Sequence, residues 1–147
     1  MINVSSYTSA LTAKLITALP TTDIERGERI NFDPGRCPWV GVYPGNVSTA
    51  PKTIGAGANR WASEMQIQVV AQTSSFVNDG QAASDALEAL IASIEQAVDA
   101  DLTLGLSGFR VLSTSREYRY VVFDDDGGGS IFMPQAVISF NCEARAA

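Results

Sequence analysis

The stretch RWASEMQIQVVAQTSS, residues 60–75, alternates apolar and polar side chains with a period of two. Met65, Ile67, Val69 and Ala71 share one side of the extended chain, and most positions between them are glutamines. Successive side chains of a strand point to opposite faces of a sheet, so this pattern predicts a β-strand with one buried face.

The next stretch, NDGQAASDALEALIASIEQAV at residues 78–98, has a different period. Its apolar residues recur every three or four positions, and Asn78, Asp79 and Gly80 precede them as a start signal. This spacing predicts an amphipathic helix over about residues 81–100, with one apolar stripe to bury. The stripe consists of Ala83, Leu87, Leu90, Ile91, Ile94 and Val98.

The segments before this pair are less regular. An N-terminal amphipathic helix is predicted from a cap at Ser5 or Ser6 to Pro20. Charges and breakers make residues 21–36 a long connection, and PWVGVYPG then predicts a strand of about five residues ending at Pro44-Gly45. The polar, Gly- and Ala-rich residues 45–60 are expected to be a flexible loop.

After the main helix, two strand-like runs are expected around residues 109–112 and 118–123, then a flexible tip at 124–130 and a final strand. That strand alternates Ala136, Ile138, Phe140 and Cys142 with polar or smaller residues. The elements predict one α+β domain over residues 1–147, a mostly antiparallel sheet with two helices packed on one face. The predicted core includes Ile67, Val69, Leu87, Leu90, Ile94, Ile138 and Phe140.

Composition narrows the function classes. The 147 residues carry a net charge of −6, which gives no support to general nucleic-acid binding through phosphate contacts. The N-terminus has neither a signal-peptide pattern nor a membrane span, so synthesis in the cytoplasm and no membrane partner are expected. Cys37 and Cys142 form no CxxC motif and are expected to be thiols.

Sites for catalysis, metals and cofactors are not indicated. The sequence contains no histidine, which removes the commonest zinc ligand and the usual base of a nucleophilic site. Asp124, Asp125 and Asp126 precede three glycines, but a calcium loop would need ligands where Gly128 and Gln135 stand. A solvated hairpin tip is the preferred interpretation, so we expect no enzyme, no metal and no cofactor.

Charge is unevenly distributed along the chain. No lysine or arginine occurs between Arg60 and Arg110, although the helix in that interval carries acids throughout its polar face. A merely soluble helix would explain this, but so would a subunit contact with the arginines that follow. The candidate contact residues are Asp85, Glu88 and Glu95 on the helix and Arg110, Arg116 and Arg119 on the next strand.

The order of these elements resembles the tail terminator proteins of long-tailed bacteriophages, the family that includes the lambda tail terminator. The resemblance rests on CPWVGVYPG, then a loop, RWASEMQIQVVAQTS, the acidic-faced helix NDGQAASDALEALIASIEQAV, LGLSGFRVLSTSREYRY and the final FMPQAVISFNCEAR. It extends from Val40 onward and depends on no single short motif. The connection at residues 21–36 matches no family feature.

The resemblance implies a structural protein of the virion, at the head–tail junction. Such proteins form a ring, expected here to be a homohexamer, that caps the tail tube, stops its polymerisation and offers a joining surface to the head. The implied partners are the tail tube protein and a head–tail connector or head-completion protein, while DNA passes through the channel without sequence-specific binding. Candidate contacts to neighbouring rings are Lys52, Asp124, Asp125 and Asp126.

Two alternatives stay open from the sequence. A head–tail connector or head-completion protein of the neck would have a similar size and would also form a ring. A small acidic ligand-binding domain belongs to a different class and would be a monomer.

Overall fold

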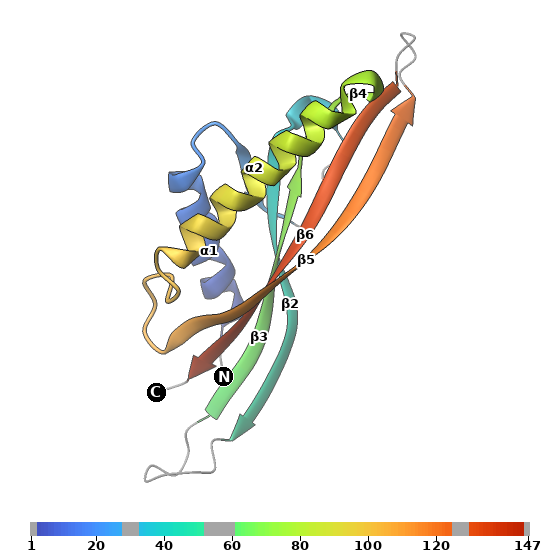
Figure 1. Ribbon diagram of the computed structural model, residues 1–147. Coiled ribbons are helices and arrows are strands. Elements are labelled where there is room, and N and C mark those ends of the chain that lie inside the picture. Colours follow the sequence, from blue (N-terminus) through green and yellow to red (C-terminus); the bar gives the residue numbers. More distant parts are fainter. Residues whose placement is uncertain (1–2, 28–32, 52–60, 125–129, 146–147) are drawn as a thin grey trace.

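The computed structural model describes residues 3–27, 33–51, 61–124 and 130–145, and the side chains of all of these except 49–51, 61–62 and 123–124. One six-stranded, mostly antiparallel sheet carries two helices on one face (Figure 1), so the predicted α+β class is confirmed. The elements are α1 (Val4–Ala18), β1 (Asp23–Arg26), the 3-10 turn η1 (Pro34–Arg36), β2 (Trp39–Pro51), β3 (Trp61–Gln72), β4 (Ser75–Phe76), the 3-10 turn η2 (Val77–Asp79), α2 (Gly80–Asp99), β5 (Phe109–Asp124) and β6 (Ser130–Arg145).

Strands β3 and β6 form the centre of the sheet. They are antiparallel, with Ile67 opposite Phe140 and Val69 opposite Ile138. These four side chains are buried under the helices. The alternation in residues 60–75 therefore predicted both the strand and its buried face correctly.

Helix α2 packs its apolar stripe on this centre. It runs from Gly80 to Asp99, close to the predicted bounds, and all six stripe residues are buried. Helix α1 lies beside it and buries Leu11 and Leu15. Its cap is Asn3, whose side chain accepts a hydrogen bond from the backbone N–H of Ser5, so the predicted cap at Ser5 or Ser6 was two or three residues too late. All seven predicted core residues are buried: Ile67, Val69, Leu87, Leu90, Ile94, Ile138 and Phe140.

The prediction that residues 21–36 are only a long connection is wrong for the residues of this range that the structure describes. Residues Asp23–Arg26 form β1, which pairs in parallel with Trp39–Val42 of β2, and Pro34–Arg36 form a 3-10 turn. Strand β1 has no alternating apolar pattern because most of its side chains are polar. Its place in the sheet comes from backbone pairing, which side-chain periodicity does not reveal.

The predicted loop at residues 45–60 is also wrong in its first half. Strand β2 continues to Pro51 and pairs with β3 as far as Trp61, after an irregularity between Pro44 and Val47. Gly45 permits this passage, because a Cβ there would lie 2.9 Å from both the Cβ and the backbone oxygen of Gln66. Residues 52–60 lie outside the described part of the chain.

The two short strands predicted at residues 109–112 and 118–123 are one strand. β5 pairs with β6 from Phe109 to Asp124, with a single irregularity between Val111 and Ser113. Polar residues between the two runs concealed this continuity. The predicted tip at 124–130 is bounded by the end of β5 and the start of β6, and residues 125–129 are not among those described.

Candidate subunit interface

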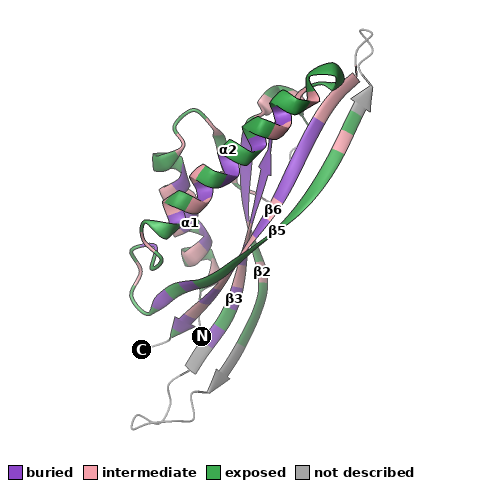
Figure 2. Cartoon of the chain, in the orientation of Figure 1, coloured by how far each residue is buried: buried purple, intermediate pink, exposed green. Residues whose placement is uncertain are grey.

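Strand β5 forms a long edge of the sheet. One of its sides pairs with β6, and no strand in the described ranges pairs with the other. Every residue from Leu112 to Tyr120 is exposed, and β5 is mostly green in Figure 2 beside the buried β6. Such an edge offers free backbone N–H and C=O groups to another strand. It is therefore a candidate contact surface.

Apolar side chains gather on the helix side of this edge. Tyr118, Tyr120 and Val122 lie at alternate positions and remain 39%, 65% and 59% exposed; we call them the aromatic stripe. Tyr120 stacks on Phe132 of β6 with ring centroids 5.8 Å apart, which holds its ring in place. Tyrosines are enriched where proteins bury surface against each other.

A shallow groove of about 400 Å³ separates the aromatic stripe from the first half of α2. Its helix wall carries the carboxylates of Asp85 and Glu88, and Gln81 donates a 2.8 Å hydrogen bond to Asp85. The groove thus combines negative charge with aromatic rings. Two of the predicted contact residues lie in it.

The third acid of the predicted contact, Glu95, is already paired within the chain. Arg116 donates to it through Nε at 2.7 Å and Nη2 at 2.5 Å, and Arg116 Nη1 lies 3.9 Å from Glu88. These hydrogen bonds raise the pKa of Arg116 above its usual range. Arg116 therefore joins β5 to α2 in the same subunit, where the sequence suggested a contact between subunits.

The three predicted arginines do not form one cluster. Arg116 lies opposite Ile138, on the helix side of the sheet, whereas Arg110 and Arg119 lie opposite Glu143 and Gln135 on the other face. The strand alternation and the irregularity after Val111 separate them. Arg119 Nη2 lies 3.5 Å from Glu117 Oε1, an exposed pair within β5.

The face away from the helices carries a polar ladder across three strands. Gln66 donates to Asn141 Oδ1 at 3.2 Å, and Asn141 donates to Ser113 Oγ at 3.0 Å. Sequence alternation predicted the polar character of this face. The ladder connects β5 to the centre of the sheet.

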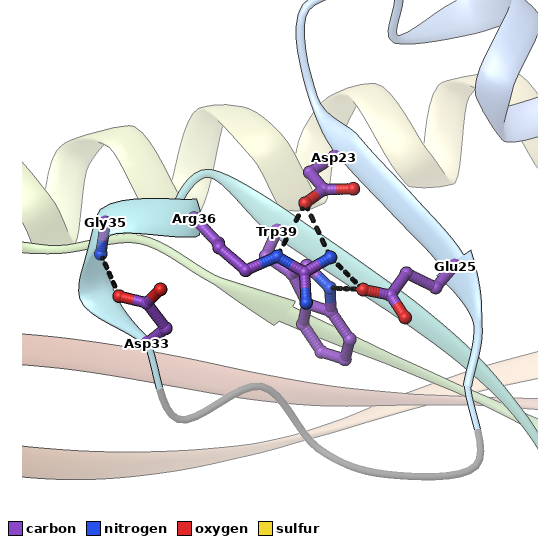
Figure 3. Close-up of polar contacts among 6 residues, drawn as sticks. All are labelled: Asp23, Glu25, Asp33, Gly35, Arg36 and Trp39. Atoms are coloured by element: carbon purple, nitrogen blue, oxygen red, sulfur yellow. Dashed lines mark hydrogen bonds and ion pairs between the residues drawn. The ribbon is translucent and has the colours of Figure 1, made fainter.

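The same face has a buried corner that the sequence did not predict. Trp39 is fully buried there and donates through Nε1 to Glu25 Oε1 at 3.1 Å. Arg36 donates to Asp23 at 3.0 and 2.8 Å and also to Glu25 (Figure 3), and these bonds raise the pKa of Arg36. The sequence contained one signal for this corner, a tryptophan that follows a charge-rich segment. It did not show which carboxylate would accept the hydrogen bond of the tryptophan.

Gln72 lies beside this corner, opposite Trp39 on one side and Gln135 on the other. Its side chain is fully buried. Its Oε1 and Nε2 have no hydrogen-bond partner among the described residues. A buried amide in this situation costs stability.

Cys37 and Cys142 are not joined in a disulfide. Burial raises the pKa of Cys142 to about 12, and burial also raises that of the half-buried Cys37. Both therefore stay protonated near neutral pH. Within the described ranges, no three histidine, cysteine or acidic side chains are grouped to hold a metal ion.

Several predicted contacts remain outside what the structure describes. These are Lys52, Asp125 and Asp126, together with the side chain of Asp124, whose backbone ends β5. Among the described helices, none is both long and apolar enough to cross a bilayer. In comparisons with known proteins, no family model and no curated protein matched the sequence.

Proposed function

We propose that this chain is a tail terminator of a long-tailed bacteriophage, a virion protein that forms a ring on the end of the tail tube. The observation that supports this most is the edge strand β5, exposed from Leu112 to Tyr120 and bordered by the aromatic stripe. Subunits of a ring need such a surface to meet. The segments on which the resemblance rests form β2, β3, α2, β5 and β6, in this order along the chain.

A ring formed by rotation brings two different patches of the subunit together. The sheet offers two different edges for this purpose: β5 on one side and the short strand β1 beside β2 on the other. They differ in length and in side chains, because β1 carries Asp23 and Glu25 while β5 carries Arg119 and the tyrosines. An edge-to-edge contact of unlike strands is the arrangement we propose for the ring.

Charge supports the second part of the proposal, passage of DNA without binding. The chain has 16 acidic and 10 basic residues. Of the basic ones, Arg36 and Arg116 are held by carboxylates of their own chain. A ring of such subunits would repel phosphates and leave DNA free to move.

The test is tube capping. The tail tube protein is polymerised with and without this chain, and electron microscopy measures tube length and looks for a ring at the tube end. We expect the chain to shorten the tubes and cap them. Tubes of unchanged length without caps would contradict the proposed function, and binding to connector rings instead would favour the neck-protein alternative.

A matched pair of variants locates the contact. Tyr120→Glu places a charge in the aromatic stripe, and Ile16→Glu places one on α1 at an apolar residue that is also exposed, at 52%. We expect Tyr120→Glu to lose capping while Ile16→Glu retains it. The opposite result would move the ring contact to α1.

A further inference from the structure

The charges in the middle of β5 are arranged so that this segment can pair with a second, antiparallel copy of itself. Around Tyr118 the order is Arg116, Glu117, Tyr118, Arg119, Tyr120, with unlike charges on the two sides of the central tyrosine. We propose that two copies of the free protein pair through β5, antiparallel, about a two-fold axis at Tyr118. This inference does not depend on the proposed function.

The register follows from charge. With the axis at Tyr118, Glu117 of each copy lies opposite Arg119 of the other, and this pair occurs twice. Moving the axis by one residue sets Glu117 against Glu117 or Arg119 against Arg119, and moving it by two toward the N-terminus sets Arg116 against Arg116. Like charges directly opposite in a sheet are destabilising, and opposite charges are stabilising. An axis at Tyr120 avoids like charges too, but it leaves Glu117 opposite Phe123 and Arg119 opposite Val121. Of these registers, only the one centred on Tyr118 pairs Glu117 with Arg119.

The helix side of the strand fits the same register. Tyr118 would meet Tyr118 at the axis, and Arg116 of each copy would lie opposite Tyr120 of the other. Such an arrangement covers Tyr120, which is 65% exposed in the single chain, and places a guanidinium beside an aromatic ring. Paired residues of antiparallel strands share a face, so both copies would present their helices on the same side of one continuous sheet.

The groups needed for this pairing are accessible. Glu117 and Arg119 interact with each other at only 3.5 Å within the strand, and their side chains are 65% and 55% exposed. Neither would have to be withdrawn from a buried contact. Free backbone groups along the outer edge of β5 supply the main-chain hydrogen bonds, and the charges select the register.

The proposed dimer and the proposed ring would compete for the same edge of the sheet, strand β5. A two-fold dimer would hide β5, so a ring that uses β5 could assemble only after the dimer separates. The dimer would also protect the free protein from open-ended edge pairing, which is the hazard of a long exposed strand.

Charge reversal tests the register in the full chain, with sedimentation velocity to measure dimerisation. Glu117→Arg and Arg119→Glu should each weaken the dimer roughly tenfold or more, because each sets like charges opposite each other twice. The double variant, with both reversals, should restore dimerisation, because the pairs are then opposite again. Because the double variant also restores the intrachain Glu117–Arg119 pair, the control is an equimolar mixture of the two single variants. The mixture should dimerise, although neither chain regains its own pair, whereas an effect within one chain would not be rescued by mixing.

A cysteine placed on the axis gives a second readout. Residues directly opposite in an antiparallel pair are about 4.5–5.5 Å apart at Cα, within reach of a disulfide. Tyr118→Cys should therefore form a disulfide-linked dimer under mild oxidation, with the 118–118 link identified by mass spectrometry. Thr114→Cys is the control, because residue 114 would face Val122 and should not be linked.

The proposal is overturned if the wild-type chain stays monomeric across a wide concentration range. It is also overturned if the single reversals leave the dimer unchanged, or if the control cysteine is linked and the axial one is not. Tube capping is measured separately, so failure of the dimer leaves the proposed function standing, and failure of capping leaves the dimer standing.

Discussion

Strands β3 and β5 both pair with β6, one on each side, yet most side chains of β3 are buried and most of those of β5 are exposed. In one row across the sheet, Phe140 of β6 has Ile67 of β3 on one side and Thr114 of β5 on the other. Ile67 is fully buried, whereas Thr114 is exposed. The strand between neighbours holds the core, and the strand at the edge is free to make contacts outside the chain.

This contrast separates stability from recognition. The apolar face of β3 packs against the helices, and even its opposite face is buried at Val70 and Gln72. Most of β5 lies beyond the cover of the helices, so substitutions there should change association more than folding. Four predictions test this difference between β3 and β5, and they are given from the largest expected change in stability to the smallest.

The largest difference should appear within the row itself. Ile67→Ala should lower the free energy of unfolding by about 2–5 kcal/mol, because it opens a cavity in a filled core. Thr114→Ala in the same row should change it by less than about 0.5 kcal/mol. Urea unfolding of both variants measures the pair. Equal losses would show that the middle of β5 belongs to the core.

Gln72 is the exception within β3. Replacing it by methionine removes two buried polar atoms without partners and keeps a side chain of similar length, so Gln72→Met should raise the free energy of unfolding by about 1–3 kcal/mol. Gln68→Met, on the same face but only half-buried, is the control and should have a smaller effect. Destabilisation by Gln72→Met would mean that the amide has a role that its contacts do not show.

Cys142 tests the beginning of β5, where the strand is still covered. It lies opposite Met65 of β3 and Val111 of β5, and burial raises its pKa from 9.0 to about 12. Below pH 9 the thiol is protonated in both states, and this contribution to stability is complete. Above pH 9 the unfolded thiol ionises while the folded one does not, so stability should fall by up to about 1.4 kcal/mol per pH unit until the folded pKa is reached.

The measurement is unfolding by urea between pH 8 and 10.5, compared with Cys142→Ala. The variant should lose less stability over this interval, since other titrating groups are common to both proteins. Parallel pH profiles would mean that solvent reaches the thiol and that β5 is open from its start.

The smallest effect belongs to the ion pair that joins β5 to α2. Arg116 and Glu95 keep 37% and 23% of their side-chain surface exposed, and partly exposed pairs contribute about 0–1 kcal/mol. Arg116→Ala should therefore cost less than about 1 kcal/mol, and added salt should reduce the difference from wild type. Arg110→Ala, at an exposed position of β5 outside both this ion pair and the Glu117–Arg119 pairs of the proposed dimer, serves as the control, with no detectable cost expected.

The spacing of apolar residues was sufficient to predict the central strands and helix α2. The alternation in β3 and β6 and the stripe of α2 predicted their faces correctly, because a buried face demands apolar residues at a fixed spacing. It failed at the edges. Strand β1, the extension of β2 to Pro51 and the continuity of β5 were missed, because these segments are held by backbone pairing and bury few side chains.

The candidate interface divides in the same way. The sequence indicated an acidic helix followed by arginines, and Asp85 and Glu88 do line a groove. It did not indicate that Arg116 would pair with Glu95 or that Arg110 and Arg119 would lie on the opposite face. It also missed the aromatic stripe, although the alternation of Tyr118, Tyr120 and Val122 in REYRYVVF was a usable signal.

The sequence by itself thus determined the helices, the central strands and the class of fold, because the spacing of apolar residues is a property of residues close together in the chain. The position of the edges and the partners of the charges required the folded sheet. Backbone hydrogen bonds are nearly indifferent to side-chain identity, and a single irregularity after Val111 decides which arginine faces α2. Contacts of this kind join residues far apart in the chain, and no local pattern records them.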